Sequence, residues 1–206
     1  MRNKKQIKVK ICGITELSEI KVINEVLPDY IGMVLFCESS KRNISLEKAK
    51  ELLKALDPRV LAVAVVVAPN LEQVTAIQEL GFHMIQIHKE VTQEVLEHIS
   101  LPIWKAYHMN QEDIDLLTHP SIMGYVIDSV NPGSGQIFDW EEALDIKTYG
   151  KLFILAGGLH EGNIHDAIFL LHPDVVDVSS GVERKDGNGK DGEKIKTFIE
   201  KVRSYE

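Results

Sequence analysis

Two residues that could transfer protons each stand directly after a short apolar segment. Cys12 follows Lys8–Ile11 and precedes Gly13, and Asp128 follows Met123–Ile127. A thiol and a carboxyl group in such places can act as a general base and a general acid, so this pair suggests proton transfer in both directions. The alternative for Cys12 is a small buried apolar residue, because free cysteine is among the most buried residue types.

Glycine-rich turns follow the last two apolar segments of the chain. Gly157 and Gly158 follow one of them, and Ser180 and Gly181 follow the other. Glycines let the backbone approach an anion closely, and backbone N–H groups with a serine hydroxyl can bind phosphate oxygens. Each turn alone is a weak signal, because glycine is common in turns. Together they predict a phosphate-binding site.

Three further polar residues are candidates for contacting a substrate. Arg42 could hold a carboxylate with its planar guanidinium, although the alternative is a surface charge in a polar loop. His88 is a candidate ligand contact or a structural hydrogen-bond donor. Asp177 could bind a sugar hydroxyl or pair inside the protein. Cys37 also follows an apolar segment, but it lacks a flanking motif like that of Cys12, so we predict that it is not catalytic.

The segments that position these residues alternate between two kinds. Short runs rich in β-branched residues predict strands, and longer runs of helical period predict helices. The predicted strands are Lys8–Ile11, Tyr30–Phe36, Val60–Val67, His83–Ile87, Pro102–Tyr107, Met123–Ile127, Leu152–Leu155 and Val175–Val178. The predicted helices are Glu16–Val26, Leu46–Leu56, Leu71–Leu80, Val91–Ile99, Gln111–Leu117, one around Trp140–Leu144, Asn163–Leu171 and Gly192–Val202.

Eight strand–helix units with apolar strands predict a parallel α/β sheet that is covered by helices. An open doubly wound sheet and a closed (βα)8 TIM barrel both fit, and the number eight favours the barrel. We expect it to be a single domain over residues 1–206, with its active site at the carboxyl ends of the strands. Thr15 and Ser45 are the predicted N-caps of the first two helices, and Gly81 is the predicted C-cap of the third.

Composition excludes several classes of protein. The 206 residues carry a net charge of −8, which argues against a general nucleic-acid binder. Five basic residues among the first ten, including Lys8 and Lys10, are interpreted as a solvated chain end, and the alternative is a basic N-terminal arm. The longest apolar run, Val60–Pro69, is too short to span a membrane. The two cysteines form no disulfide framework, so we expect a reducing, cytoplasmic location.

Metal and nucleotide motifs are missing from the sequence. The eight histidines form no HExxH motif and the two cysteines form no CxxC motif, so a metal site is not expected. There is no P-loop. The Gly133-Ser134-Gly135 stretch is not a dinucleotide fingerprint, because no third glycine opens a helix at the required spacing.

These segments, taken in order, resemble the phosphoribosylanthranilate isomerase family of tryptophan biosynthesis. The resemblance runs nearly end to end, and it rests on six stretches. They are Val9-Lys10-Ile11-Cys12-Gly13-Ile14-Thr15, Ser39-Ser40-Lys41-Arg42, Gln86-Ile87-His88, Asp128-Ser129 with Gly133-Ser134-Gly135 and Phe138-Asp139-Trp140, Leu155-Ala156-Gly157-Gly158-Leu159 with Asn163, and Val176-Asp177-Val178-Ser179-Ser180-Gly181-Val182-Glu183 followed by Gly189-Lys190-Asp191.

The resemblance implies an Amadori rearrangement of N-(5-phosphoribosyl)anthranilate. In this interpretation Asp128 is the general acid, Cys12 is the general base and Arg42 holds the anthranilate carboxylate. No cofactor is required, because proton transfers suffice. A free thiol has a pKa of ~8.5, so a thiolate base needs a nearby positive charge or dipole.

The expected partner is a small phosphorylated substrate, with no nucleic acid and no membrane, and the chain is a monomer or a homodimer. One alternative is another phosphosugar isomerase, such as the one of the histidine pathway, whose family has an aspartate at the first strand end. The other alternative is a barrel that binds a phosphorylated ligand without catalysis.

Overall fold

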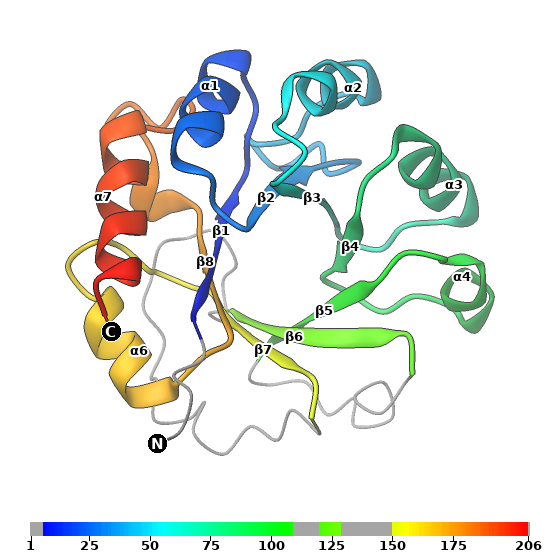
Figure 1. Ribbon diagram of the computed structural model, residues 1–206. Coiled ribbons are helices and arrows are strands. Elements are labelled where there is room, and N and C mark those ends of the chain that lie inside the picture. The colour runs from blue at the N-terminus through cyan, green and yellow to red at the C-terminus, as the bar shows by residue number, and fades with distance from the viewer. Residues whose placement is uncertain (1–5, 109–119, 129–149, 206) are drawn as a thin grey trace.

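Eight parallel strands close into a barrel within the part of the chain that the structure describes (Figure 1). The structure is a computed structural model, and it describes residues 6–108, 120–128 and 150–205. The strands are β1 (Lys8–Cys12), β2 (Tyr30–Val34), β3 (Leu61–Val66), β4 (Met84–Ile87), β5 (Ile103–His108), β6 (Ile122–Asp128), β7 (Leu152–Leu155) and β8 (Val175–Val178). Each pairs with its neighbour in the sequence, and β8 pairs with β1, which confirms the TIM barrel and excludes the open sheet.

Helices cover the outside of the barrel, as Figure 1 shows. Within the described residues they are α1 (Leu17–Val26), α2 (Leu46–Ala55), α3 (Leu71–Leu80), α4 (Gln93–His98), α6 (Ile164–Leu171) and α7 (Gly192–Arg203), with a short 3-10 helix, η2 (Ser180–Val182). Ser45 caps α2 by accepting a hydrogen bond from the Lys48 N–H, and Gly81 ends α3 in the left-handed conformation, so both cap predictions are confirmed.

The predicted elements that fall within the described residues are all found. The bounds predicted for α3, β7 and β8 agree with the structure. Most other ends differ by one or two residues, and Tyr30–Phe36 was predicted too long: β2 ends at Val34, and Phe36 has a φ of 56°, which turns the chain out of the strand. The helices predicted at Gln111–Leu117 and around Trp140–Leu144 lie outside the described residues.

The prediction of Thr15 as the N-cap of the first helix is wrong. The helix begins at Leu17 with Glu16 as its cap, and the buried Glu19 side chain supplies the acceptor. Glu19 Oε2 accepts hydrogen bonds from the backbone N–H groups of Thr15 and Glu16, at 2.6 and 3.0 Å. Thr15 therefore stands one residue before the N-cap, and its backbone N–H donates to Glu19, the third residue of the helix.

Two layers of buried side chains hold the barrel together. The larger layer packs strand residues such as Ile11 and Ile31 against the helices. The smaller layer consists of strand-end and strand residues that point to the interior, including Val63, Trp104 and Val126. Successive strand residues face opposite sides of a sheet, so residues two apart share a side. Lys10 and Cys12 of β1 therefore both face the interior.

The prediction that Lys10 belongs to a solvated chain end is wrong. Lys10 is fully buried, and its Nζ lies 2.7 Å from Asp177 Oδ2 on β8. The two residues are register partners where β1 and β8 pair, so the closure of the barrel brings them together. Lys8, two residues earlier on the same strand, is exposed as predicted.

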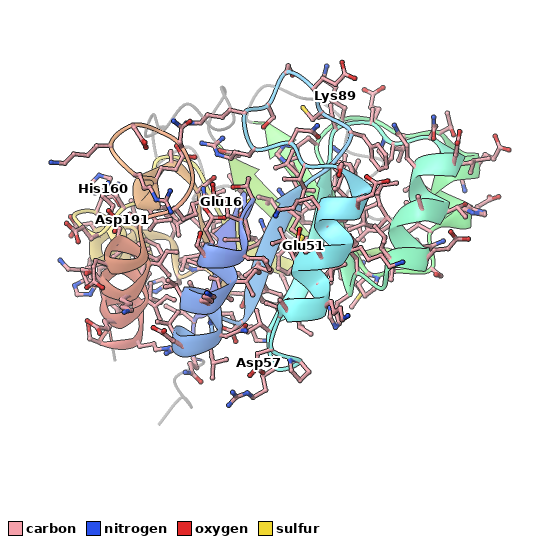
Figure 2. All side chains as sticks on the ribbon, turned by 90° about the horizontal axis from the view of Figure 1, so that it is seen from above. Glu16, Glu51, Asp57, Lys89, His160 and Asp191 are labelled. Carbon is pink, nitrogen blue, oxygen red and sulfur yellow. The ribbon has the colours of Figure 1, made fainter. Side chains whose placement is uncertain are left out.

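The loops divide between the two ends of the barrel. Figure 2 shows Lys89, in the loop after β4, and Asp57, in the loop before β3, at opposite ends of the molecule. The end that carries Lys89 holds the carboxyl ends of the strands, and with them Cys12 and Asp128. Among residues 6–108, 120–128 and 150–205 there is no helix with both the length and the apolar character to cross a membrane.

Replacing Glu19 should destabilise the fold. Its side chain also accepts a hydrogen bond from the backbone N–H of Lys190, which joins α1 to the loop before α7. Glu19→Ala would leave three backbone donors without their acceptor, and we expect a loss of about 3 kcal/mol in the free energy of unfolding, measured by urea titration. Glu25→Ala on the same helix removes a largely exposed carboxylate and should cost at most about 0.5 kcal/mol. Equal losses in the two variants would contradict this account.

Candidate active site

A cavity of about 430 Å³ opens at the carboxyl ends of the strands. Eight of the nine predicted site residues line it, although they come from six different strand ends. They are Cys12, Arg42, His88, Asp128, Gly157, Gly158, Asp177 and Ser180. A larger cavity, of about 980 Å³, is lined by residues such as Gln6 and Asp174 near the amino ends of β1 and β8, and it contains none of the predicted site residues. The larger cavity is therefore not the one that holds the predicted site residues. We take the smaller cavity as the candidate site because it contains them.

Gly181, the ninth predicted residue, does not line the cavity but stands beside it. A Cβ atom built on Gly181 would lie 2.0 Å from the backbone oxygen of Leu159. The two glycine-rich loops, after β7 and after β8, are thus packed against each other with no space for a side chain. Gly181 thus allows the two loops to pack closely, while its part in phosphate binding stays a prediction.

The loop after β7 is shaped by its two glycines. Gly157 and Gly158 have φ values of 81° and 65°, in the region that residues with a side chain rarely adopt. Asn163 braces the loop, since its Nδ2 donates to the Gly158 oxygen at 3.0 Å and its Oδ1 accepts from the His160 N–H at 2.8 Å. The loop is therefore held open toward the cavity with its backbone fixed.

Cys12 ends β1, and its thiol lies just below the mouth of the cavity. Only 9% of the residue is exposed. Burial raises the pKa of the Cys12 thiol, because the low-dielectric surroundings disfavour the thiolate, while the positive charges of Lys10 and Lys190 act in the opposite direction. Gly32 is its register partner on β2, and a Cβ atom there would lie 2.8 Å from Cys12 Sγ. The missing side chain of Gly32 makes the space that the thiol occupies.

Asp177 pairs inside the barrel and also lines the cavity. Its Oδ2 accepts the hydrogen bond from Lys10, while its buried Oδ1 has no hydrogen-bond partner among the described residues. The sequence left two roles open for Asp177, and the ion pair with Lys10 is the first of them. The second role, a hydrogen bond from a sugar hydroxyl to the unpaired Oδ1, stays a prediction.

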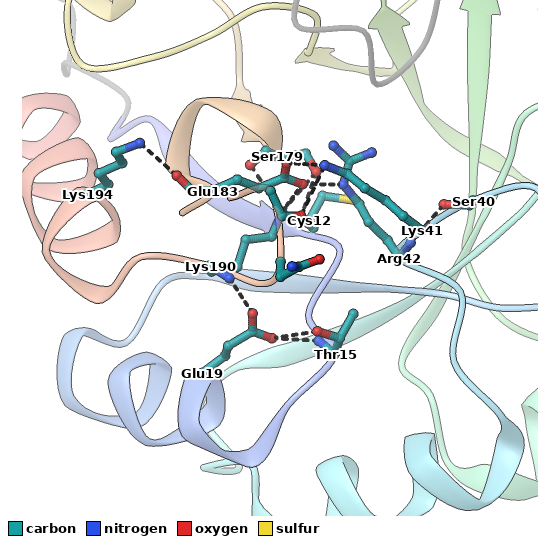
Figure 3. A network of polar contacts seen from close by, with 12 residues as sticks. Cys12, Thr15, Glu19, Ser40, Lys41, Arg42, Ser179, Glu183, Lys190 and Lys194 are labelled. Atoms are coloured by element: carbon teal, nitrogen blue, oxygen red, sulfur yellow. Dashed lines mark hydrogen bonds and ion pairs between the residues drawn. The ribbon is translucent and has the colours of Figure 1, made fainter. Parts of the chain in front are cut away.

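Arg42 reaches the cavity from the loop between β2 and α2. Figure 3 shows it beside Lys41, with both side chains bound to Glu183. Arg42 Nε donates to Glu183 Oε1 at 2.6 Å, and Lys41 Nζ donates to Glu183 Oε2 at 2.7 Å. Arg42 Nη2 is buried and has no hydrogen-bond partner among the described residues. Glu183 thus fixes one edge of the guanidinium, and a donor remains for the predicted substrate carboxylate.

Lys190 does not line the cavity, but its charge acts on Cys12, and sequence reasoning quoted it without giving it a role. It is almost fully buried, and its Nζ donates to Ser179 O and Oγ, both at 3.1 Å, and to Glu183 Oε1 at 3.4 Å (Figure 3). Burial lowers the pKa of Lys190, and Glu183 opposes that effect. Ser179 Oγ in turn donates to the Cys12 backbone oxygen at 3.0 Å. In the sequence, Lys190 is marked only by its place between Gly189 and Asp191. Its burial cannot be read from the sequence, because it depends on contacts between distant strands.

His88 follows β4 and lies beside Gln86. The Gln86 Nε2 and His88 Nε2 atoms are 3.0 Å apart, and both residues line the cavity. Cys37, predicted to be non-catalytic, also lines the cavity, and its sulfur lies 3.6 Å from Ser39 Oγ.

Within residues 6–108, 120–128 and 150–205, no three His, Cys, Asp or Glu side chains are grouped as metal ligands.

The barrel and this cavity define a class of protein. It is a TIM barrel with a thiol, a carboxyl group and a guanidinium around one cavity, and with two glycine-rich loops at the last two strand ends. Such a site suits acid–base chemistry on an anionic, phosphorylated ligand.

Comparison with known proteins identifies the family. The chain matches the family model of N-(5'-phosphoribosyl)anthranilate (PRA) isomerase over residues 9–201. A relative of that name from Clostridium kluyveri is 43% identical over 201 residues, which cover 96% of this chain and 98% of the relative. The chain belongs to the N-(5'-phosphoribosyl)anthranilate isomerase family.

Solved structures agree with this assignment. The crystal structure of phosphoribosyl anthranilate isomerase from Thermus thermophilus has a TM-score of 0.86 at 28% identity, and the match covers 97% of this chain and 100% of that one. A crystal structure of the same kind of isomerase in complex with reduced 1-(o-carboxyphenylamino)-1-deoxyribulose 5-phosphate has a TM-score of 0.82 at 31% identity, covering 96% and 99% of the two chains.

A side chain at Gly32 should disturb the thiol without disturbing the fold. In Gly32→Ala the new methyl group would lie 2.8 Å from Cys12 Sγ and 3.1 Å from Lys10 Nζ, so it shifts the sulfur and crowds the lysine beneath it, and a misplacement of about 1 Å can lower turnover about 100-fold. Gly162→Ala is the matched control, since its methyl group would meet only the His160 ring, at 3.0 Å. Isomerase assays and thermal unfolding of both variants test this prediction. Normal turnover of Gly32→Ala would show that the position of the sulfur is not critical.

Proposed function

We propose that this cavity isomerises N-(5'-phosphoribosyl)anthranilate to 1-(2-carboxyphenylamino)-1-deoxyribulose 5-phosphate, with Cys12 as general base and Asp128 as general acid. Family membership supports the reaction. The observation that supports the residue roles is that Cys12 and Asp128, at the ends of β1 and β6, three strands apart around the barrel, line one cavity. In this proposal the sugar lies between the two groups.

The reaction opens the sugar ring first. Asp128 donates its proton to the ring oxygen as the bond from that oxygen to C1 breaks, and the nitrogen lone pair forms the C1=N bond of a protonated Schiff base. The Cys12 thiolate then removes the proton from C2. The released electron pair forms the C1=C2 bond, and the C=N pair returns to nitrogen, which gives an enolamine. Protonation of C1 and loss of the proton from the C2 hydroxyl give the ketone, so no atom is gained or lost overall.

Binding is assigned to the remaining lining residues. Arg42 holds the anthranilate carboxylate with the edge of its guanidinium that Glu183 leaves unoccupied. Gly157, Gly158, Ser180 and Gly181 form the phosphate site. The solved relative that holds a carboxyphenylamino deoxyribulose phosphate supports this division, because its ligand carries both anionic groups.

His88 and Asp177 are assigned to the sugar. His88 lies on the wall of the cavity near Gln86, and Asp177 offers its unpaired Oδ1 as an acceptor for a hydroxyl group. The absence of a cofactor, the cytoplasmic location and the single domain over residues 1–206 stay predictions. The choice between monomer and homodimer stays open.

Removing either proton-transfer group should abolish turnover. General acid–base groups contribute about 10²–10⁴-fold, so Cys12→Ala and Asp128→Asn should each lose at least about 100-fold while the proteins stay folded. Consumption of phosphoribosylanthranilate, made in situ and followed by its fluorescence, measures the loss. Cys37→Ala removes the second thiol of the cavity and should keep most of the activity. Near-normal turnover in Cys12→Ala or Asp128→Asn would refute the role of that residue. A wild-type protein that binds product without turnover would instead support a non-catalytic barrel.

A further inference from the structure

The burial of Cys12 creates a problem for a general base. The thiolate removes the proton, yet burial raises the pKa of this thiol and so makes the thiolate the minor form at neutral pH. A fixed positive charge close to the sulfur would offset part of this effect. Lys10 is the interior residue two positions before Cys12 on the same strand, and sequence reasoning gave it no part in the site.

The structure places the Lys10 ammonium next to the sulfur. A Cβ atom built on Gly32 would lie 2.8 Å from Cys12 Sγ and 3.1 Å from Lys10 Nζ. Both atoms therefore border the same small space, the one left by the missing side chain of Gly32. Lys10 is fully buried, so little water separates the two groups or screens their interaction.

Asp177 keeps Lys10 charged at this depth. Burial alone would lower the pKa of Lys10, but the Asp177 carboxylate 2.7 Å away and the Cys12 sulfur together outweigh burial, and the pKa of Lys10 is raised. A buried ion pair is weak evidence for a stabilising role, because apolar residues of similar size often serve the fold as well. Its place, directly below the thiol, points to a role in the chemistry.

We propose that Lys10 is a positioning residue of the active site, whose buried ammonium holds the Cys12 sulfur at the edge of the cavity and favours its thiolate, while Asp177 limits the strength of that effect. This inference rests on the proposed function of Cys12 as the base. In this proposal Asp177 on β8 affects the ionisation of Cys12 on β1, because the two strands pair where the barrel closes.

Other charged groups around the cavity set the background for this effect. Lys190, from the loop after η2, adds a second positive charge that acts on the thiol in the same direction as Lys10. Asp177 acts in the opposite direction. Arg42, His88 and Asp128 line the same cavity from the ends of β2, β4 and β6. Removing the charge of Lys10 should therefore raise the pKa of Cys12.

The experiment titrates the thiol directly, without substrate. In a Cys37→Ser background Cys12 is the single thiol of the protein, and its ionisation is followed by the ultraviolet absorbance of the thiolate and by the rate of alkylation. Lys10→Met removes the charge and keeps the length of the side chain, and we expect the midpoint to rise by about one pH unit or more, about a 10-fold loss of thiolate.

Lys8→Met is the matched control. It removes the same charge from the same strand, but Lys8 is exposed and donates to the Tyr30 hydroxyl at 3.3 Å, away from the cavity. Its midpoint should equal that of the background protein. The proposal is overturned if Lys10→Met titrates like Lys8→Met.

A double variant covers the case in which Lys10→Met fails to fold, because it leaves Asp177 buried without its partner. Lys10→Met with Asp177→Asn removes both charges, and its midpoint should lie above that of the background protein, because Lys10 acts on the thiol more strongly than Asp177 does. A midpoint equal to or below that of the background protein would also overturn the proposal. Because no substrate is present, these outcomes are distinct from failure of the proposed function, which would show as turnover by Cys12→Ala.

Discussion

The parallel pairing of β1 with β8 is the contact on which the active site depends. It joins residues that are 167 positions apart, and it places Lys10 beside Asp177 inside the barrel. One residue beyond the paired strand ends, Ser179 Oγ donates to the Cys12 backbone oxygen. Cys12, the buried charges beside it and the glycine-rich loop after β8 therefore take their positions from a single closure. If β8 left β1, Cys12 would lose both its neighbouring charge and the wall that buries it.

Buried charges and missing side chains together shape the cavity. Lys10 and Lys190 are buried ammonium groups, and each has a carboxylate partner, Asp177 or Glu183, because an unpaired buried charge would cost several kcal/mol. Glycines supply the space that the long side chains around the cavity need. A Cβ atom at Gly13, for example, would lie 2.5 Å from Arg42 Cδ. The site thus combines a low dielectric, which strengthens each interaction, with a backbone that leaves room for a substrate.

The sequence predicted the barrel well because its signals are local. The apolar segments and the caps at Ser45 and Gly81 are read from neighbouring residues, and eight strand–helix units then favour closure. The cavity residues were predictable because strand ends meet at one face. The burial of Lys10 was missed because a charged residue near a chain end is usually exposed to solvent. Its burial depends on β8, a strand at the far end of the sequence. The role of Glu19 at the start of α1 was missed for the same kind of reason, since its carboxylate also accepts a hydrogen bond from the backbone N–H of Lys190.

The central claim is that a thiol on β1 and a carboxyl group on β6 act on one sugar from two sides of the cavity. A crystal structure of the protein with reduced 1-(o-carboxyphenylamino)-1-deoxyribulose 5-phosphate tests it most directly. The account predicts that C2 of the ligand lies about 3.5 Å from Cys12 Sγ, as reacting atoms do in a productive complex, with the Asp128 carboxyl group on the other side of the sugar. A ligand whose C2 lies far from the sulfur, or whose sugar does not pass between the two groups, would contradict it.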